Sequence, residues 1–407
     1  MDDKIAELKP YICSSNDALE LKLVRHVRDL EDETTTFKPE MSHQVFENET
    51  IFGYKDLKIQ LYYAAGNLET YLGMTYSEKV DKTLTDGVEP DEVLKNVAEK
   101  LDSKFHTNID SFAQSLDKDL VFKPEGELLS SVSIDDDGET RRFEIYKSSI
   151  KSAKFKEHHL RLRTFLLWYI DAASFIDVDD DQWDYFNMYE RIKMDADNSV
   201  RYATVGFATV YLYYAFPEHI RPRIAQVLIL PPFQGMGLGN HLLRGVYQEY
   251  MKNELVKDIT VEDPSEDFQR LRDYVDCTNC CTLSSFSKDK LMQGFNEAMA
   301  TEARKHFKIN KKQARRVYEI LRLKATNLHN SDEYRSYRLD IKNRLNIPYK
   351  KEENDQKKLE LAKKSKEGSS GLSCISQNEN RIQVLEKEYR DLEDEYCKVI
   401  KRLDVLC

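Results

Sequence analysis

The chain has 407 residues, 41% of them hydrophobic and 33% charged, and carries a formal net charge of −11. It is long enough for two or three cored domains. No apolar run approaches the roughly 20 residues that span a bilayer. The start, Met1-Asp2-Asp3-Lys4, lacks a signal-peptide layout, and seven unevenly spread cysteines do not describe a secreted disulfide framework. We therefore expect an intracellular protein without a membrane span.

The first 130 residues alternate strand-like and helical pieces. Apolar, β-branched runs at 19–24 and 57–63 predict strands, and the pattern near 90–101 predicts a helix. We therefore expect an amino-terminal α+β module over residues 1–130.

Residues 131–288 predict a second mixed sheet with flanking helices. The acidic turn at 135–139 predicts a hairpin. After it we expect a helix over 160–173, strands over 203–214 and 225–230, a helix over 238–250 and a strand over 258–264. The fold class is accordingly α+β.

The carboxyl-terminal part is helical in pattern. Residues 289–349 predict a helical module, and 350–376, lysine-rich and then Gly-Ser-Ser-Gly, predict a flexible linker. Apolar positions over 377–407 alternate in steps of three and four, which indicates a heptad helix. A short coiled coil and docking of this helix onto its own enzyme body both remain open.

Charge is unevenly distributed along the chain. Residues 1–303 carry 35 Lys and Arg against 55 Asp and Glu, whereas residues 304–351 carry 15 against 4. An acidic body favours association with a basic peptide, although acidity also serves solubility. The basic segment is interpreted either as a solvated helical face or as an import signal or nucleic-acid contact.

A glycine-rich loop follows the strand at 225–230. The loop, 234–239, reads Gln-Gly-Met-Gly-Leu-Gly and contains three of the chain's 14 glycines. A strand, a glycine loop and a helix start bring unpaired N–H groups and the positive end of the helix dipole to one point, which suits a pyrophosphate. The Walker Gly-Lys-Ser/Thr is missing, and the spacing is one residue short of the dinucleotide fingerprint. The alternative is a tight turn without a ligand.

Two carboxylates, Glu262 and Asp263, end the strand at 258–264. A carboxylate at a strand end can serve as a general base toward an amine, since a lysine with a pKa near 10.4 is almost wholly ammonium at neutral pH and has no free lone pair. Either acid could instead cap the helix that begins near 264–266. We assign the catalytic role to Glu262 and the capping role to Asp263.

An acidic run at 177–184 contains Trp183, one of two tryptophans, and an aromatic run follows at 211–214. Carboxylates and rings together suit a lysine- and arginine-rich peptide. The alternative is a core tryptophan beside a solvated loop.

Cys277, Cys280 and Cys281 lack a second Cys/His pair at zinc-finger spacing, so we expect no metal site.

The loop at 234–239 resembles the coenzyme A loop of GNAT acetyltransferases, Gln/Arg-x-x-Gly-x-Gly/Ala. More specifically, Ile-Leu-Pro-Pro-Phe-Gln-Gly at 229–235, Val-Glu-Asp-Pro-Ser at 261–265 and Leu-Arg-Asp at 271–273 resemble the type B histone acetyltransferase catalytic subunit. The resemblance runs from about residue 16 to about 350 and includes four further stretches, 20–25, 52–55, 173–180 and 334–339.

The resemblance implies a set of site residues. Glu262 is the general base. The acetyl-CoA contacts are Val227, Leu228, Ile229, Gln234, Gly235, Met236, Gly237, Leu238, Gly239 and Asn240. The contacts to the histone H4 tail are Glu49, Trp183, Tyr211, Leu212 and Tyr213.

The resemblance also implies the reaction and its setting. Acetyl passes directly from acetyl-CoA to lysines of the histone H4 tail on newly made histones before chromatin assembly, with histone 2A as a candidate second substrate. A WD-repeat histone chaperone is the implied partner, and the cytoplasm and nucleus are the implied locations. Two other functions remain as alternatives, a non-catalytic histone-binding scaffold and a small-amine N-acetyltransferase.

Overall fold

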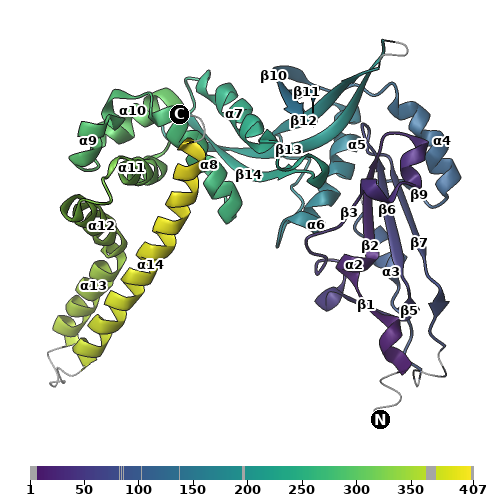
Figure 1. Ribbon diagram of the computed structural model, residues 1–407, viewed down its shortest axis with the longest axis horizontal. Helices are drawn as coiled ribbons and strands as arrows, with labels where there is room; N and C mark the ends of the chain where they lie inside the picture. Colours follow the sequence, from purple (N-terminus) through teal and green to yellow (C-terminus); the bar gives the residue numbers. More distant parts are fainter. Residues whose placement is uncertain are drawn as a thin grey trace. The chain divides into compact units, whose positions relative to one another are not determined.

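A computed structural model of the chain describes residues 7–81, 83, 85, 87–101, 103–136, 138–194, 198–363 and 373–404. The chain divides into two compact units, Met1–Tyr213 with Arg223–Glu249, and Tyr214–Pro222 with Tyr250–Cys407. Figure 1 labels the elements of both units. The class is mixed α+β, as the sequence predicts.

The amino-terminal part of the first unit contains a five-stranded sheet in the order β3-β2-β6-β7-β9. Strands β2 and β6 are parallel, and β6 and β7 are antiparallel. Their bounds are β2 Leu19–Val24, β3 Thr36–Phe37, β6 Lys58–Ala64, β7 Thr70–Thr75 and β9 Phe105–His106. The strands predicted at 19–24 and 57–63 are thus confirmed.

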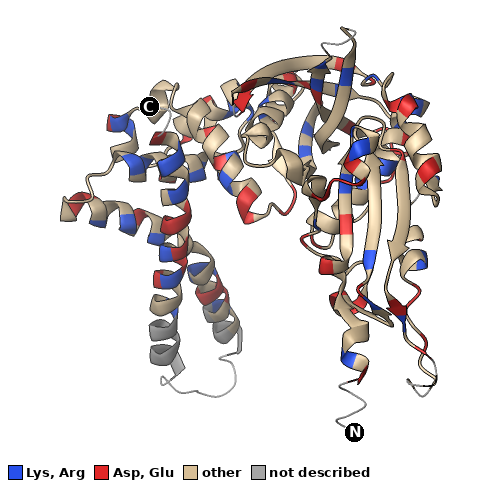
Figure 2. Cartoon of the chain, turned by 45° about the vertical axis from the view of Figure 1, so that its right-hand side comes forward, with Lys and Arg blue, Asp and Glu red and all other residues tan. Residues whose placement is uncertain are grey.

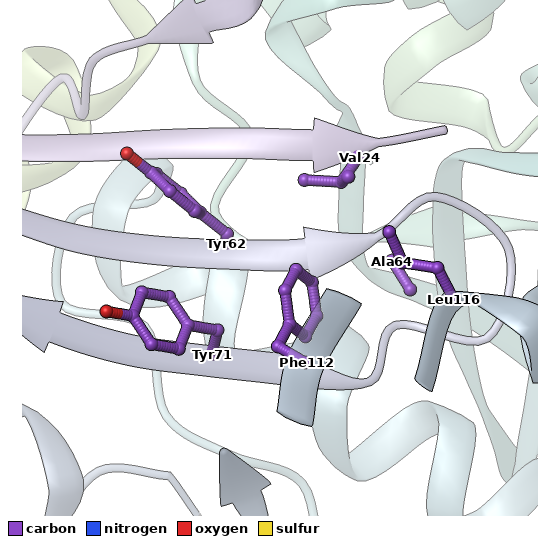
Figure 3. Packing of buried hydrophobic residues seen from close by; sticks show 6 residues of the cluster. All are labelled: Val24, Tyr62, Ala64, Tyr71, Phe112 and Leu116. Atoms are coloured by element: carbon purple, nitrogen blue, oxygen red, sulfur yellow. The ribbon is translucent and has the colours of Figure 1, made fainter. Parts of the chain in front are cut away.

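Helix α4 (Ile109–Asp119) supplies the apolar cover of this sheet. In Figure 3 its side chains point onto residues of β2, β6 and β7, and the six form one buried cluster: Val24, Tyr62, Ala64, Tyr71, Phe112 and Leu116. Phe112 is fully buried, and its ring lies 5.9 Å from that of Tyr71. The cluster gives the amino-terminal module its own core.

Shorter elements complete this part of the chain. Two strand pairs, β1 with β4 and β5 with β8, lie outside the five-stranded sheet. The bounds are β1 Ile12–Ser14, β4 Thr50–Phe52, β5 Tyr54–Lys55, β8 Glu78–Lys79, α2 Ser15–Ala18 and α3 Val93–Ala98. Helix α3 confirms the helix predicted near 90–101, although it is shorter.

A six-stranded sheet in the order β10-β11-β12-β13-β14-β15 follows. The predicted hairpin at 135–139 is confirmed, because Asp136 pairs with Glu139 in the antiparallel β10–β11 ladder. The bounds are β10 Glu127–Asp136, β11 Glu139–Ser148, β12 Trp183–Lys193, β13 Val200–Ala215, β14 His219–Ile229 and β15 Thr260–Val261. The strand predicted at 258–264 is therefore only two residues long.

The helix predicted over 160–173 is placed too late. Helix α5 spans Ala153–Leu162, a 3₁₀ turn covers Arg163–Phe165, and α6 spans Leu166–Tyr169. The start lies earlier because the side chain of Ser152 accepts a hydrogen bond from the Phe155 N–H and caps α5.

The second unit is mainly helical, as predicted for 289–345. Several helices here and in the first unit begin after an Asn or Ser whose side chain accepts from the first-turn N–H groups: Asn108, Ser152, Ser265, Asn296, Asn310 and Asn330. The bounds in the second unit are α8 Glu266–Cys280, α9 Lys288–Met292, α10 Glu297–Phe307, α11 Lys311–Ala325, α12 Ser331–Leu345, α13 Ile347–Lys363 and α14 Ser373–Asp404. Among the described residues, no helix is long and apolar enough to cross a membrane.

The flexible linker expected over 350–376 is wrong for the residues that α13 covers, and residues 364–372 lie outside the described part of the chain. Residues 350–363 are helical. The sequence pattern missed this helix because its composition is strongly polar, and polar side chains contact α14 in the described part of α13. Tyr349 donates to Glu388 at 3.0 Å, and Arg381 lies 3.1 Å from Glu353.

Five heptad positions of α14 face the unit's own helices, whereas Ile382, the first position of the predicted seam, is 67% exposed. Leu385, Tyr389, Tyr396, Val399 and Leu403 are buried, and α14 packs on α8, α11 and α12. Of the two interpretations left open by the sequence, internal docking is therefore the one that the structure adopts.

The basic segment 304–351 has a structural use that neither sequence interpretation foresaw. At least eight of its 15 Lys and Arg side chains pair with acids of the same unit. Three of those acids are Asp273, Glu319 and Asp340, and the first two are fully buried. Figure 2 shows Lys and Arg interspersed with Asp and Glu along these helices. Much of the positive charge is thus neutralised inside the unit.

Candidate active site

The glycine loop joins strand β14 to helix α7 (Leu238–Met251) in the first unit. A 3₁₀ turn at Pro231–Phe233 ends the strand, and Gly235 and Gly237 then adopt φ values of +81° and +77°. No atom lies within 4 Å of the position that a Cβ would take at either glycine. The backbone is therefore open at both positions, and L side chains rarely adopt such φ values. We call residues 234–240 the cradle.

The cradle presents backbone donors at the start of a long helix. Within the described part of the chain, the N–H groups of Gly235, Met236 and Gly237 make no backbone hydrogen bond, whereas Asn240 N–H donates to the Gly237 carbonyl at 3.1 Å. Helix α7 has 14 residues, so its positive dipole end adds to these donors. Unpaired N–H groups, open space and a helix start suit a diphosphate ligand.

The strand before the cradle approaches its neighbour closely. A Cβ on Gly206 of β13 would stand only 2.3 Å from the Leu228 carbonyl oxygen of β14. The Leu230 N–H donates to the Val205 carbonyl at 2.9 Å, and the Gln234 side chain donates to the Ile229 carbonyl at 2.9 Å. Leu228 is buried, whereas Val227 and Ile229 are half-buried. Sequence reasoning missed Gly206, an isolated glycine inside a strand pattern, which often marks close backbone approach.

Glu262 lies in the second unit, directly after β15, and its residue is exposed. Nearby in sequence, Asp258 is buried and pairs with Arg221 at 2.5 Å. The capping role assigned to Asp263 is wrong, because Ser265 caps α8 by accepting from the Phe268 N–H. Asp263 instead adopts a φ of +28°. Of the two carboxylates, neither caps the helix.

The aromatic residues predicted to contact a peptide lie together in the first unit. Trp183 of β12 is directly opposite Tyr211 of β13, and their rings are 4.9 Å apart. The rings of Tyr211 and Tyr213 are 4.6 Å apart, and the Leu212 N–H donates to the Gln182 carbonyl. Trp183 is half-buried and Tyr213 exposed, so the cluster is a surface feature and Trp183 is no core anchor.

Acidic side chains border the cluster, and a cavity of about 270 Å³ lies beside Trp183, with Asp181 and Asp184 in its lining. These acids already meet local lysines: Asp184 lies 3.1 Å from Lys147, and Asp181 lies 3.9 Å from Lys151. Solvent-exposed pairs contribute only about 0–1 kcal/mol, so the exposed Lys151–Asp181 pair is weak. Burial, together with hydrogen bonding to Asp180, raises the pKa of Tyr211.

Glu49 lies elsewhere in the first unit and holds its own loop. Its carboxylate accepts from the Ser42 N–H at 2.7 Å and from the Asn16 amide at 2.8 Å. The Ser42 hydrogen bond is the main reason that the pKa of Glu49 lies below its usual value. Its φ of +53° adds to the evidence of a constrained turn. A substrate contact by Glu49 stays a prediction.

The two buried cysteines of the cluster, Cys277 and Cys280, do not suit covalent catalysis, whereas Cys281 is exposed. Cys277 and Cys280 are fully buried, and burial raises the pKa of both thiols far above the usual value. A nucleophilic cysteine needs a thiolate. In the described part of the chain, no group of three or more His, Cys, Asp or Glu side chains is arranged to hold a metal ion.

Comparison with known proteins decides the family. The chain is 47% identical over 406 residues to the histone acetyltransferase type B catalytic subunit of Homo sapiens, covering 99% of this chain and 95% of that protein. The chain belongs to the type B histone acetyltransferase catalytic subunit family. It is accordingly a histone acetyltransferase with acetyl-CoA as its cosubstrate, which confirms the family that the motifs predict.

Matches to family models and to a second relative agree with this family. The family model for the HAT1 amino terminus matches residues 11–171, and the model for the carboxyl-terminal part of the type B catalytic subunit matches 272–323. A catalytic subunit of this type from Dictyostelium discoideum is 33% identical and covers 91% of this chain and 78% of that protein. Among solved structures, an aminoglycoside acetyltransferase from a soil metagenomic sample aligns at 16% identity with a TM-score of 0.24, covering 32% of this chain and 84% of that one.

Proposed function

We propose that this type B acetyltransferase transfers acetyl to lysine side chains of the histone H4 amino-terminal tail, with histone 2A as a second substrate, and that Glu262 is its general base. The observation that carries the proposal is the cradle, in which two glycines at positive φ leave open space in front of unpaired N–H groups. Family membership supplies the reaction class.

In the proposed reaction, bound acetyl-CoA supplies the thioester whose acyl group is transferred. The cradle amides bind its diphosphate, and the backbone of Val227, Leu228 and Ile229 aligns its pantetheine arm. Glu262 takes a proton from the lysine ammonium, directly or through a water, so that the amine gains a lone pair. A backbone N–H near Leu228 stabilises the developing negative charge on the acyl oxygen, an effect of roughly 3 kcal/mol in comparable enzymes.

Trp183, Tyr211, Leu212 and Tyr213 are the proposed binding surface for the tail. Their rings cover the aliphatic stems of lysine and arginine, while the bordering carboxylates attract the charged ends. The H4 tail is preferred over a small amine because the chain's relatives are histone acetyltransferases. Action on newly made histones, a WD-repeat chaperone partner, and residence in both cytoplasm and nucleus belong to the same proposal.

The experiment compares Glu262→Gln with Asp263→Asn, a matched control in the neighbouring exposed carboxylate. With an H4 tail peptide and labelled acetyl-CoA, Glu262→Gln should lower kcat about 10²–10⁴-fold and leave coenzyme A affinity unchanged. Asp263→Asn should behave like the wild type.

The pH profile adds a second readout. Without a base, the variant depends on free lysine, whose fraction rises tenfold per pH unit below a pKa near 10.4, so its rate should climb steeply with pH. Wild-type turnover by Glu262→Gln would remove Glu262 from the mechanism. Faster acetylation of a polyamine than of the H4 peptide would instead support the small-amine alternative, and no transfer to either substrate would support the scaffold.

A further inference from the structure

Two arginines meet one buried carboxylate beside the cradle. The carboxylate of Glu190 in β12 pairs with Nε of Arg141 at 2.7 Å and with a terminal nitrogen of Arg25 at 2.6 Å. The Glu190 side chain is 6% exposed, whereas the side chains of Arg141 and Arg25 are 20% and 37% exposed, so a buried carboxylate is held by two partly exposed arginines. Arg25 follows strand β2 and Arg141 lies in β11, so the cluster joins three strands of the first unit.

The same two arginines contact the segment that leads into the cradle. The guanidinium groups lie 5.8 Å (Arg25) and 5.6 Å (Arg141) from the ring centre of Phe233, which is buried and ends the 3₁₀ turn before the loop. Nη1 of Arg141 also lies 3.6 Å from Sδ of Met236, the residue between Gly235 and Gly237. Arg141 therefore reaches both the base and the middle of the loop.

The cluster is nearly neutral, which indicates a positional role. Arg141 donates to Asp136 at 2.9 Å as well as to Glu190, so two guanidinium groups face two carboxylates. Such a balance leaves little excess charge to attract an anion. A planar guanidinium with fixed donors is, however, well suited to hold several partners in one geometry. Glycine loses more backbone freedom on ordering than any other residue, so a loop with three glycines depends on contacts from outside it.

We propose that Arg141, fixed by Glu190, is a positioning residue that holds the cradle open for the diphosphate of acetyl-CoA through Phe233 and Met236. Arg25 holds the opposite oxygen of Glu190 and completes the cluster. This inference rests on the proposed function, because it assumes that the cradle binds the coenzyme.

The test is Arg141→Met, which keeps an unbranched apolar chain and removes the guanidinium. Arg142→Met is the matched control: Arg142 is the next residue on the same strand, faces the other side, and pairs with Glu144 at 3.2 Å while 47% exposed. Arg141→Met should raise the Kd for coenzyme A, measured by calorimetry, about tenfold, equal to roughly 1.4 kcal/mol. KM for acetyl-CoA should rise alike, while kcat changes less than twofold.

A substrate without phosphates separates positioning from general damage. Acetyl-pantetheine does not use the cradle, so its kcat/KM should be the same in Arg141→Met and the wild type. Hydrogen exchange of the peptide spanning 231–241 should accelerate in the variant, and Arg142→Met should match the wild type in every assay.

The proposal is overturned if Arg141→Met binds coenzyme A like the wild type, or loses activity equally with acetyl-CoA and acetyl-pantetheine. If Arg141→Met fails to fold, Arg141→Lys is the test, because lysine keeps the charge but cannot contact Glu190, Asp136 and Phe233 together. A wild-type Kd for coenzyme A in Arg141→Lys would then show that Arg141 does not position the cradle. Failure of the proposed function looks different, since the wild type itself would then not bind coenzyme A.

Discussion

The substitution Tyr396→Phe tests whether the carboxyl-terminal helix is part of the second unit's core. Tyr396 of α14 is 1% exposed and donates to Glu319 of α11 at 2.8 Å. Glu319 is fully buried and also accepts from Arg315 and Arg344. The variant keeps the ring and those two arginine partners but deletes one hydrogen bond to a buried charge. Such a bond contributes about 1.5–3 kcal/mol, so we expect the free energy of unfolding to fall by about 2 kcal/mol.

The assay follows denaturant unfolding by two probes. Both tryptophans, Trp168 and Trp183, belong to the first unit, so tryptophan fluorescence reports that unit, while far-ultraviolet circular dichroism also reports the helices of the second. If the units unfold separately, Tyr396→Phe should shift only the dichroism transition to lower denaturant. Coincident shifts would mean that they unfold as one.

Tyr349→Phe is the matched control, because it deletes a Tyr-to-Glu bond between α13 and α14, to Glu388, at a site that is partly exposed. Water replaces that bond, so no measurable change is expected. Equal shifts from the two substitutions, or none from Tyr396→Phe, would refute the reasoning that burial of Glu319 makes the contact strong.

Three other perturbations test the first unit. Gly237→Val should weaken coenzyme A binding at least 100-fold by calorimetry, because its methyl groups fill the open space of the cradle and the φ of +77° disfavours a β-branched residue; unchanged affinity would place the diphosphate elsewhere. Gly206→Ala should lower the thermal midpoint and the free energy of unfolding by about 1–3 kcal/mol, since its Cβ would lie 2.3 Å from the Leu228 carbonyl oxygen; wild-type stability would contradict the close approach. Burial lowers the pKa of His159 to about 3. Below pH 6.5 His159 is therefore protonated in the unfolded chain but neutral in the folded chain, so the free energy of unfolding falls by about 1.4 kcal/mol at pH 5.5. His159→Phe should remove that part of the loss in the free energy of unfolding between pH 7.5 and 5.5. Burial raises the pKa of Asp119 to about 6, which has the opposite effect, but this contribution is the same in both proteins and cancels when the variant is compared with the wild type. An unchanged pH dependence would show that His159 is charged when folded.

Some features of the candidate site depend on residues adjacent in the sequence and were predictable, whereas others depend on distant residues and were not. The cradle was predictable because glycines, a strand end and a helix start are adjacent in the chain, and their conformations follow from local backbone preferences. Gly206 and Arg141 were not predictable, because their partners Leu228, Met236 and Glu190 lie at distant positions that only strand pairing brings together. Asp263 was misjudged for a smaller reason, as a serine two residues later caps the helix equally well.

The sequence by itself determined the α+β class, the hairpin, the cradle and the family, since each depends on spacing or motif along the chain. Tertiary structure decided the use of charge and of the heptads. A heptad seam specifies an apolar face but not what covers it, and here α8, α11 and α12 cover α14. Likewise a basic segment resembles a solvated face until folding brings Asp273, Asp258 and Glu386 against it. Burial and pairing arise from contacts between distant residues, and those exist only once the chain has folded.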